Sequence, residues 1–162
     1  MYNASLYRCE LTKANMPTPD LASNLMVSPH GALHVVRAAL IRDDRLLLAQ
    51  RETGEWHIPG GKVEPGQALA EAVARECEEE VGVTGIRLDS DFTVFDRRMM
   101  SGAPPYGGRE YVGHCALGTW SHGEPRPLDE TMDVTLIHPG ELQSLKQVRP
   151  DTLVILAKLG LL

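Results

Sequence analysis

The residues most suggestive of chemistry are three glutamates whose spacing would place them on one face of a helix. Glu76, Glu79 and Glu80 stand at positions i, i+3 and i+4. At about 3.6 residues per turn they would project within an arc of roughly 100°. Three carboxylates so close together repel one another unless a cation lies among them. Hard divalent ions such as Mg²⁺ prefer oxygen ligands and also bind substrate phosphates, so the spacing indicates metal-dependent phosphate chemistry.

A glycine-rich segment precedes these glutamates and would let a ligand approach the main chain. Gly60, Gly61 and Gly66 permit tight backbone turns, because glycine has no side chain to restrict them. A backbone carbonyl at Gly60 or Gly61 could therefore add a metal ligand that no side chain reveals. We take Gly61 as the candidate.

The glutamates need a rigid support, and the hydrophobic pattern around them predicts a helix over Ala68–Val81. Gly82 stands where a glycine ends a helix. Apolar residues recur at helical spacing and would anchor one side of this helix to a sheet. They are Leu69, Ala72, Val73, Cys77 and Val81. Arg75 forms i, i+4 pairs with Glu71 and Glu79, so we expect it to orient a carboxylate and not to contact substrate.

Short apolar or β-branched runs on both sides of this helix predict the strands of a sheet. They are His34–Ile41, Arg45–Arg51, Ile86–Arg97, Glu110–Leu117 and Met132–Ile137. The first two form a hairpin around Asp43 and Asp44, and Met99–Gly108 has the composition of a loop. Trp56–Pro59 is expected to be a short extended piece that ends at Gly60 and Gly61. Closing helices are expected at Pro139–Leu145 and Asp151–Leu161. This order predicts an α+β fold, an α/β/α sandwich with a mixed β-sheet between helices.

The weakly patterned residues 1–31 are interpreted as an N-terminal extension, with one short strand near Ser5–Leu11, and residues 32–162 as the folded domain. The net charge of −6 leaves no basic surplus for long DNA or RNA. The three cysteines form no CxxC pair, which argues against a zinc site or a disulfide framework. The chain shows no secretion signal and no apolar run of membrane-spanning length, so we expect a cytoplasmic protein without membrane contact.

The segment Gly61–Val83 resembles the Nudix box, whose pattern is G-x5-E-x7-R-E-U-x-E-E-x-G-U, with U an aliphatic residue. The matching residues are Gly61, Arg75, Glu76, Glu79, Glu80, Gly82 and Val83. Cys77 fills an aliphatic position, and Gln67 replaces the usual glutamate. The order of elements from about residue 33 also resembles a Nudix domain, including the entry Trp56–Gly61. So many fixed positions make a chance match far less frequent than for a short glycine motif.

The resemblance implies a hydrolase that uses Mg²⁺ or Mn²⁺ to cut a nucleoside diphosphate linked to another moiety. Glu76, Glu79 and Glu80 correspond to the metal ligands of the family, and Glu76 is also a candidate general base. In some members the base comes from a downstream loop, where Glu130 is our candidate and Asp133 the second choice. Because the family glutamate at the Gln67 position supports the helix arginine, its loss affects the placement of Arg75 more than metal binding.

Among substrates we favour a nucleoside triphosphate, cut to a monophosphate and pyrophosphate, since no subgroup signature follows Val83. A nucleoside diphosphate sugar or a dinucleotide remains an alternative. Trp56 could stack on a base or simply close the core, and Arg97 and Arg98 could meet phosphate or sugar. A non-catalytic ligand-binding module is a further alternative that Gln67 keeps open and the intact glutamates oppose. A third is an unrelated α+β fold with an accidental match. A homodimer would be usual for the family.

Overall fold

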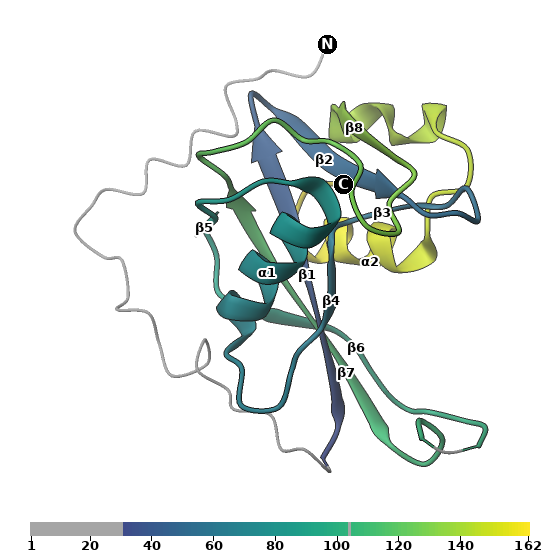
Figure 1. Ribbon diagram of the computed structural model, residues 1–162. Helices are drawn as coiled ribbons and strands as arrows, with labels where there is room; N and C mark the ends of the chain where they lie inside the picture. The colour runs from purple at the N-terminus through teal and green to yellow at the C-terminus, as the bar shows by residue number, and fades with distance from the viewer. Residues whose placement is uncertain (1–30, 104) are drawn as a thin grey trace.

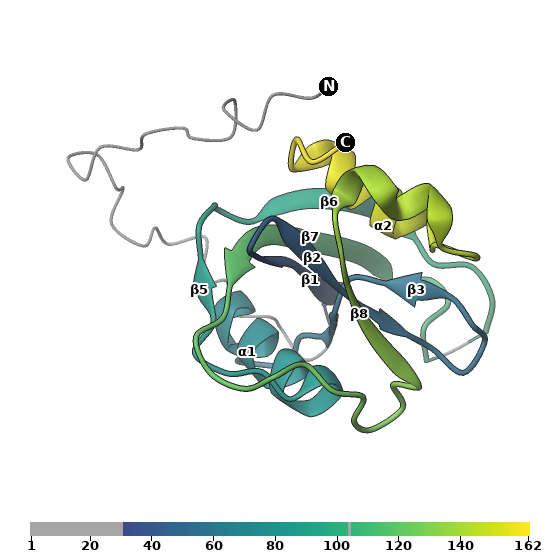
Figure 2. The same ribbon diagram turned by 90° about the horizontal axis from the view of Figure 1, so that it is seen from above.

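The computed structural model describes residues 31–103 and 105–162. Eight strands form one mixed sheet, and the helices α1 and α2 cover opposite sides of it (Figures 1 and 2). The elements are β1 (Leu33–Arg42), β2 (Arg45–Gln50), β3 (Trp56–His57), β4 (Gly60–Lys62), α1 (Leu69–Val81), β5 (Arg87–Leu88), β6 (Thr93–Met99), β7 (Glu110–Thr119), β8 (Asp133–Ile137) and α2 (Pro150–Lys158). The predicted α/β/α sandwich is confirmed. Of the predicted extension, only Gly31 is described, and the strand near Ser5–Leu11 lies outside the described residues.

The hairpin of β1 and β2 is confirmed, and its turn is the one that the sequence indicated. Asp43 and Asp44 have φ angles of 52° and 59°, and the flanking residues Arg42 and Arg45 are paired across the turn. Two consecutive residues with positive φ match the right-handed twist of the strands, which is why such turns close two-residue hairpins.

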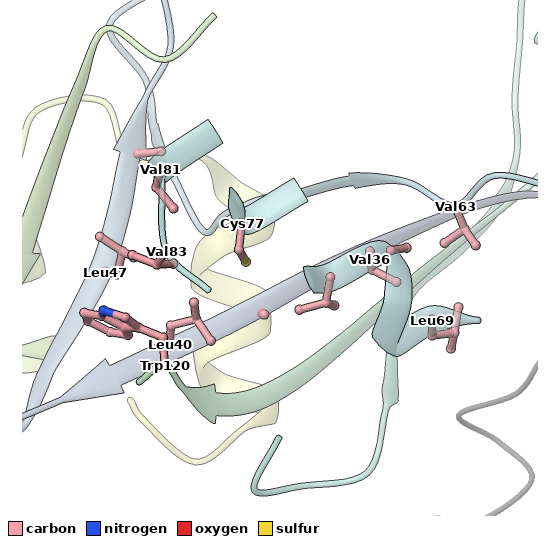
Figure 3. Packing of buried hydrophobic residues seen from close by; sticks show 13 residues of the cluster. Val36, Leu40, Leu47, Val63, Leu69, Cys77, Val81, Val83 and Trp120 are labelled. Atoms are coloured by element: carbon pink, nitrogen blue, oxygen red, sulfur yellow. The ribbon is translucent and has the colours of Figure 1, made fainter. Parts of the chain in front are cut away.

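β1 is the central strand, and its side chains contribute to the hydrophobic clusters on both sides of the sheet. It pairs in parallel with β7 and antiparallel with β2 and β4, while β8 pairs with the far edge of β2. Because side chains alternate along a strand, Val36, Ala38 and Leu40 join the hydrophobic cluster under α1 (Figure 3), whereas Ala39 joins the cluster under α2. Arg37 lies between these apolar positions and is buried.

α1 forms as the hydrophobic pattern predicts. The predicted apolar stripe, Leu69, Ala72, Val73, Cys77 and Val81, is fully buried against the sheet (Figure 3). At the first turn the Glu71 carboxylate accepts a hydrogen bond from the Ala68 backbone N–H at 3.1 Å. Gly82 ends the helix with φ 70°, in the left-handed region that favours glycine. The acidic face is thus held on a well-anchored element.

The prediction of a single strand over Ile86–Arg97 is wrong, because β5 and β6 are separate strands. Between them the Ser90 hydroxyl accepts the Leu117 backbone N–H at 2.8 Å, so a side chain replaces a main-chain partner of β7. The closing helix expected at Pro139–Leu145 is present as a 3₁₀ helix (Pro139–Ser144). Pro150 begins α2 as expected. Among the described residues, no helix is long and apolar enough to cross a membrane.

Candidate active site

The acidic face of α1 lies directly against the glycines of β4. A Cβ atom placed on Gly61 would come within 2.5 Å of the Glu76 carboxylate carbon, a distance that real side chains do not tolerate. The Glu76 side chain is 14% exposed. A side chain at Gly61 would therefore displace the Glu76 carboxylate, and the backbone at this position lies next to that group.

Arg75 binds the acidic residues and the loop ahead of the helix. Its Nη1 donates to Glu76 at 2.8 Å and to Glu79 at 3.2 Å, and its Nη2 donates to the Lys62 carbonyl at 2.8 Å. The Gln67 side-chain oxygen accepts from Nη2 at 3.4 Å. The expected role of Arg75 in orienting carboxylates fits these contacts. Gln67 keeps the link to the arginine, although without a charge.

Glu80 is partly buried and reaches β4 from the helix. Its Oε2 accepts a hydrogen bond from the Gly60 backbone N–H at 3.4 Å. Burial raises the pKa of Glu80 to about 7, while the neighbouring Arg37 and the bond from Gly60 act in the opposite direction. A buried carboxylate is stabilised in its ionised form by a nearby cation, so this environment suits a metal ligand.

The donor set on α1 and β4 fits a hard divalent cation, since it consists of oxygens only. Glu76, Glu79, Glu80 and the carbonyl of Gly61 would hold the ion. Within the described parts of the chain, no three acidic, histidine or cysteine side chains already stand as a metal-binding cluster. Glu76 and Glu79 are instead paired with Arg75, so an ion would compete with the guanidinium for these two carboxylates.

The loop that carries Glu130 packs on the last turn of α1. The backbone N–H of Leu128 donates to the Glu80 carbonyl at 3.0 Å, and that of Met132 donates to the Gln50 carbonyl at 2.8 Å. The loop therefore reaches the acidic helix, although the Glu130 side chain is exposed and its role as a base stays a prediction. The second candidate, Asp133, accepts the backbone N–H of Val134 at 2.8 Å.

A cavity of about 500 Å³ opens on the α2 side of the sheet, between β6, β7 and the start of α2. Its lining includes two aromatic rings, Phe95 and Tyr111, and two ion pairs. The pairs are Arg98 with Asp96 at 3.3 Å and Arg149 with Asp151 at 3.1 Å. The Arg98 guanidinium also lies over the Tyr111 ring, 5.0 Å from its centre.

The three residues that the sequence suggested for substrate binding are thus in different surroundings. Arg98 lines the cavity, whereas Arg97 pairs with Glu110 at 3.3 Å. Trp56 is only 9% exposed and packs in the hydrophobic cluster under α2, which leaves little surface for a base. Sequence reasoning did not find the cavity's other residues, because they come from strands and a helix far apart in the chain.

Sequence reasoning also missed Arg37, which is buried in the centre of β1. Its Nη1 donates to the Gly60 carbonyl at 2.9 Å. Burial lowers the pKa of Arg37, and the carboxylates of Asp151 and Glu80 act against that shift. The arginine is thus close enough to interact electrostatically with Asp151, which lines the cavity, and with Glu80 of α1. A cationic residue in the middle of a run of apolar residues, Val35–Leu40, was the available signal.

A mixed sheet between two helices, with an acidic helix face docked on a double glycine, defines the class of fold and site. The NUDIX domain family model matches residues 32–159. The chain therefore belongs to the NUDIX domain family.

Similar proteins agree with this assignment. The chain is 43% identical over 56 residues to a CTP pyrophosphohydrolase of Escherichia coli. The aligned segment covers 32% of this chain and 42% of that protein. It is 37% identical over 100 residues to a putative 8-oxo-dGTP diphosphatase 2 of Mycobacterium tuberculosis. This aligned segment covers 59% of this chain and 66% of that protein. In both cases less than two thirds of the relative's length is matched.

Solved structures show the same fold. The E. coli ORF135 protein superposes with a TM-score of 0.62 at 28% identity, over 81% of this chain and 91% of that one. A MutT NUDIX hydrolase from Burkholderia pseudomallei gives a TM-score of 0.59 at 29% identity, over 78% of this chain and 96% of that one.

Proposed function

We propose that this protein is a metal-dependent pyrophosphohydrolase acting on a nucleotide-like diphosphate. The observation that carries the proposal is the packing of the α1 glutamates on β4, with Glu76 against Gly61 and Glu80 bonded to Gly60. Family membership and the activities for which the two relatives are named support it.

The roles of the residues follow from their positions. When bound, Mg²⁺ or Mn²⁺ would neutralise phosphate charge and activate water. Glu79 and Glu80 would be the central ligands, with Glu76 as a further ligand or as the base that takes the proton from the attacking water. Glu130 is the alternative base, on the loop beside the end of α1. Arg75 would hold the carboxylates in place, since it already bonds Glu76 and Glu79.

Within this class we favour a nucleoside triphosphate, cut to a monophosphate and pyrophosphate. The cavity between β6, β7 and α2 offers aromatic faces for a base and charged groups for its polar edge. Arg98 and Asp151 supply a donor and an acceptor there. The two relatives whose names specify CTP and 8-oxo-dGTP support a nucleotide substrate of this size.

A substrate panel with product analysis tests the proposal. Nucleoside triphosphates, nucleoside diphosphate sugars and dinucleotides would each be incubated with Mg²⁺, and the products separated by ion-exchange chromatography. We expect a monophosphate and inorganic pyrophosphate from a triphosphate. Turnover should fall by roughly 100-fold or more in Glu79→Gln and Glu80→Gln variants, because metal ligands are lost. Absence of turnover across the whole panel would favour a ligand-binding module instead.

A further inference from the structure

Arg37 occupies a position in the centre of β1 where the neighbouring residues are apolar. Its side chain is 5% exposed and lies on the α2 side of the sheet. Nη1 donates to the Gly60 carbonyl at 2.9 Å and more weakly to the Ile58 carbonyl at 3.5 Å. Nε is buried and has no hydrogen-bond partner among the described residues.

Burying this guanidinium is unfavourable for stability. A buried polar atom without a partner costs roughly 1–3 kcal/mol, and a buried charge is often replaced by an apolar residue without loss. The next two residues of the strand, Ala38 and Ala39, are fully buried and apolar, as a residue in this environment usually is. The arginine is therefore better explained by what it holds in place than by a contribution to folding.

The residue that Arg37 holds is a glycine, so no side chain restricts its backbone torsions. Gly60 has a φ of 149°, which disfavours any side chain, and a Cβ there would clash with the Val36 carbonyl oxygen. Gly61 follows, so two successive residues have unrestricted backbone torsions. Gly60 lies opposite Arg37 in the register of β1 and β4, and the Arg37 side chain donates to the Gly60 carbonyl.

The opposite side of Gly60 contacts the proposed metal site. Its N–H donates to Glu80 while its carbonyl accepts from Arg37, so one glycine links the arginine to the carboxylate. We propose that Arg37 is a positioning residue, which fixes Gly60 and through it the Glu80 carboxylate for metal binding. This inference rests on the proposed function.

Arg37 would act through Gly60 and not by contacting the nucleotide. It does not line the cavity of about 500 Å³, although it lies close enough to Asp151, Arg149 and Tyr111 to interact with them electrostatically. Replacing a residue that hydrogen-bonds and orients a metal ligand typically weakens metal binding by roughly 10–100-fold. The expected effect is thus on metal binding first.

A Mn²⁺ titration tests the proposal without relying on turnover. The electron paramagnetic resonance signal of free Mn²⁺ measures how much of the ion is bound. The full-length protein would be compared with Arg37→Met, Arg37→Lys and Glu80→Gln. Arg42→Met is the matched control, since Arg42 lies on the same strand but pairs with Glu124 at 3.2 Å. We expect Arg37→Met to weaken Mn²⁺ binding roughly 10-fold and Arg42→Met to leave it unchanged.

Kinetics give a second measurement. In Arg37→Met the Mg²⁺ concentration for half-maximal activity should rise by a similar factor, while the KM for the nucleotide at saturating Mg²⁺ changes little. Arg37→Lys keeps a cation but not the planar fork, so it should fold and weaken Mn²⁺ binding by a smaller factor, about 3-fold. It provides the decisive comparison if Arg37→Met does not fold.

The outcomes separate the two proposals. If Arg37→Lys and any folded Arg37→Met bind Mn²⁺ like the wild type while Glu80→Gln does not, the positioning role is wrong and the proposed function stands. If the wild-type protein binds no Mn²⁺ at all, both proposals are overturned.

Discussion

At the scale of single residues, the site depends on two glycines whose lack of a side chain makes room for neighbouring groups. Gly61 leaves room for the Glu76 carboxylate, and Gly60 leaves room for the Val36 carbonyl. The two glycines bring the β4 backbone next to the helix carboxylates, where a larger residue would hold it away. The requirement for glycine is therefore steric and belongs to the site.

Gly61→Ala tests this requirement. The added methyl group would displace the Glu76 carboxylate, so we expect turnover to fall by roughly 100-fold, since misplacement of about 1 Å near the chemistry can cost that much. The measurement is kcat/KM with Mg²⁺. Gly140→Ala is the control, because a Cβ there meets only His138 at 3.3 Å. Equal activity of the two variants would contradict the packing argument.

Gln67→Glu concerns the residue at which this chain departs from the Nudix box. The Gln67 oxygen is 3.4 Å from Arg75 Nη2, and a carboxylate would make this bond shorter and stronger. A carboxylate there would hold Arg75 more firmly in the orientation from which its Nη1 bonds Glu76 and Glu79, so we expect kcat/KM to rise by about 3-fold to 10-fold at subsaturating Mg²⁺. Gln143→Glu, on the exposed 3₁₀ helix, should have no effect. A fall in activity would show that the amide is the better partner here.

At the scale of elements, the parts that the sequence predicted are those with local causes. α1 follows from its apolar stripe and from Gly82, and the β1–β2 hairpin follows from two apolar runs around Asp43 and Asp44. The break between β5 and β6 could not be predicted in this way, because it depends on a hydrogen bond between Ser90 and the distant Leu117. Strand pairing and side-chain competition of this kind appear only once the sheet is assembled.

The hairpin offers a prediction about stability that is independent of the site. Asp44 has a φ of 59°, a conformation that costs a residue with a side chain more than it costs glycine. Asp44→Gly should therefore raise the free energy of unfolding by about 0.5–1 kcal/mol, and Asp44→Ala should lower it. Urea denaturation measures both changes, and kcat should stay as it is in each variant. A destabilised glycine variant would refute the turn assignment.

At the scale of the whole molecule, the two sides of the sheet have different tasks. The α1 side carries the glutamates, the α2 side carries the cavity, and Arg37 on β1 lies between them. The sequence predicted the first side from one contiguous segment, Gly61–Val83. It could not predict the second, since Phe95, Tyr111 and Asp151 meet only when β6, β7 and α2 are folded together.

The domain limits lead to a prediction about folding. The NUDIX domain family model matches residues 32–159, so the part of the chain that the family shares begins after Gly31. A chain that starts at Gly31 should therefore fold cooperatively, with a Tm within about 2–4 °C of that of the 162-residue chain, which corresponds to roughly 1 kcal/mol or less. Calorimetry of both proteins measures this difference. A shortened chain without a cooperative transition would show that residues 1–30 belong to the fold.

Metal binding should be visible in the stability of the whole molecule, because an ion that binds only the folded state stabilises it by mass action. At 100 times the dissociation constant this contribution is about 2.7 kcal/mol. Mg²⁺ should therefore raise the Tm, and EDTA should return it to the starting value. Glu80→Gln should show a much smaller rise, since the buried carboxylate beside Gly60 is lost. An equal rise in both proteins would mean that the ion binds elsewhere, and the glutamates of α1 would then need another explanation.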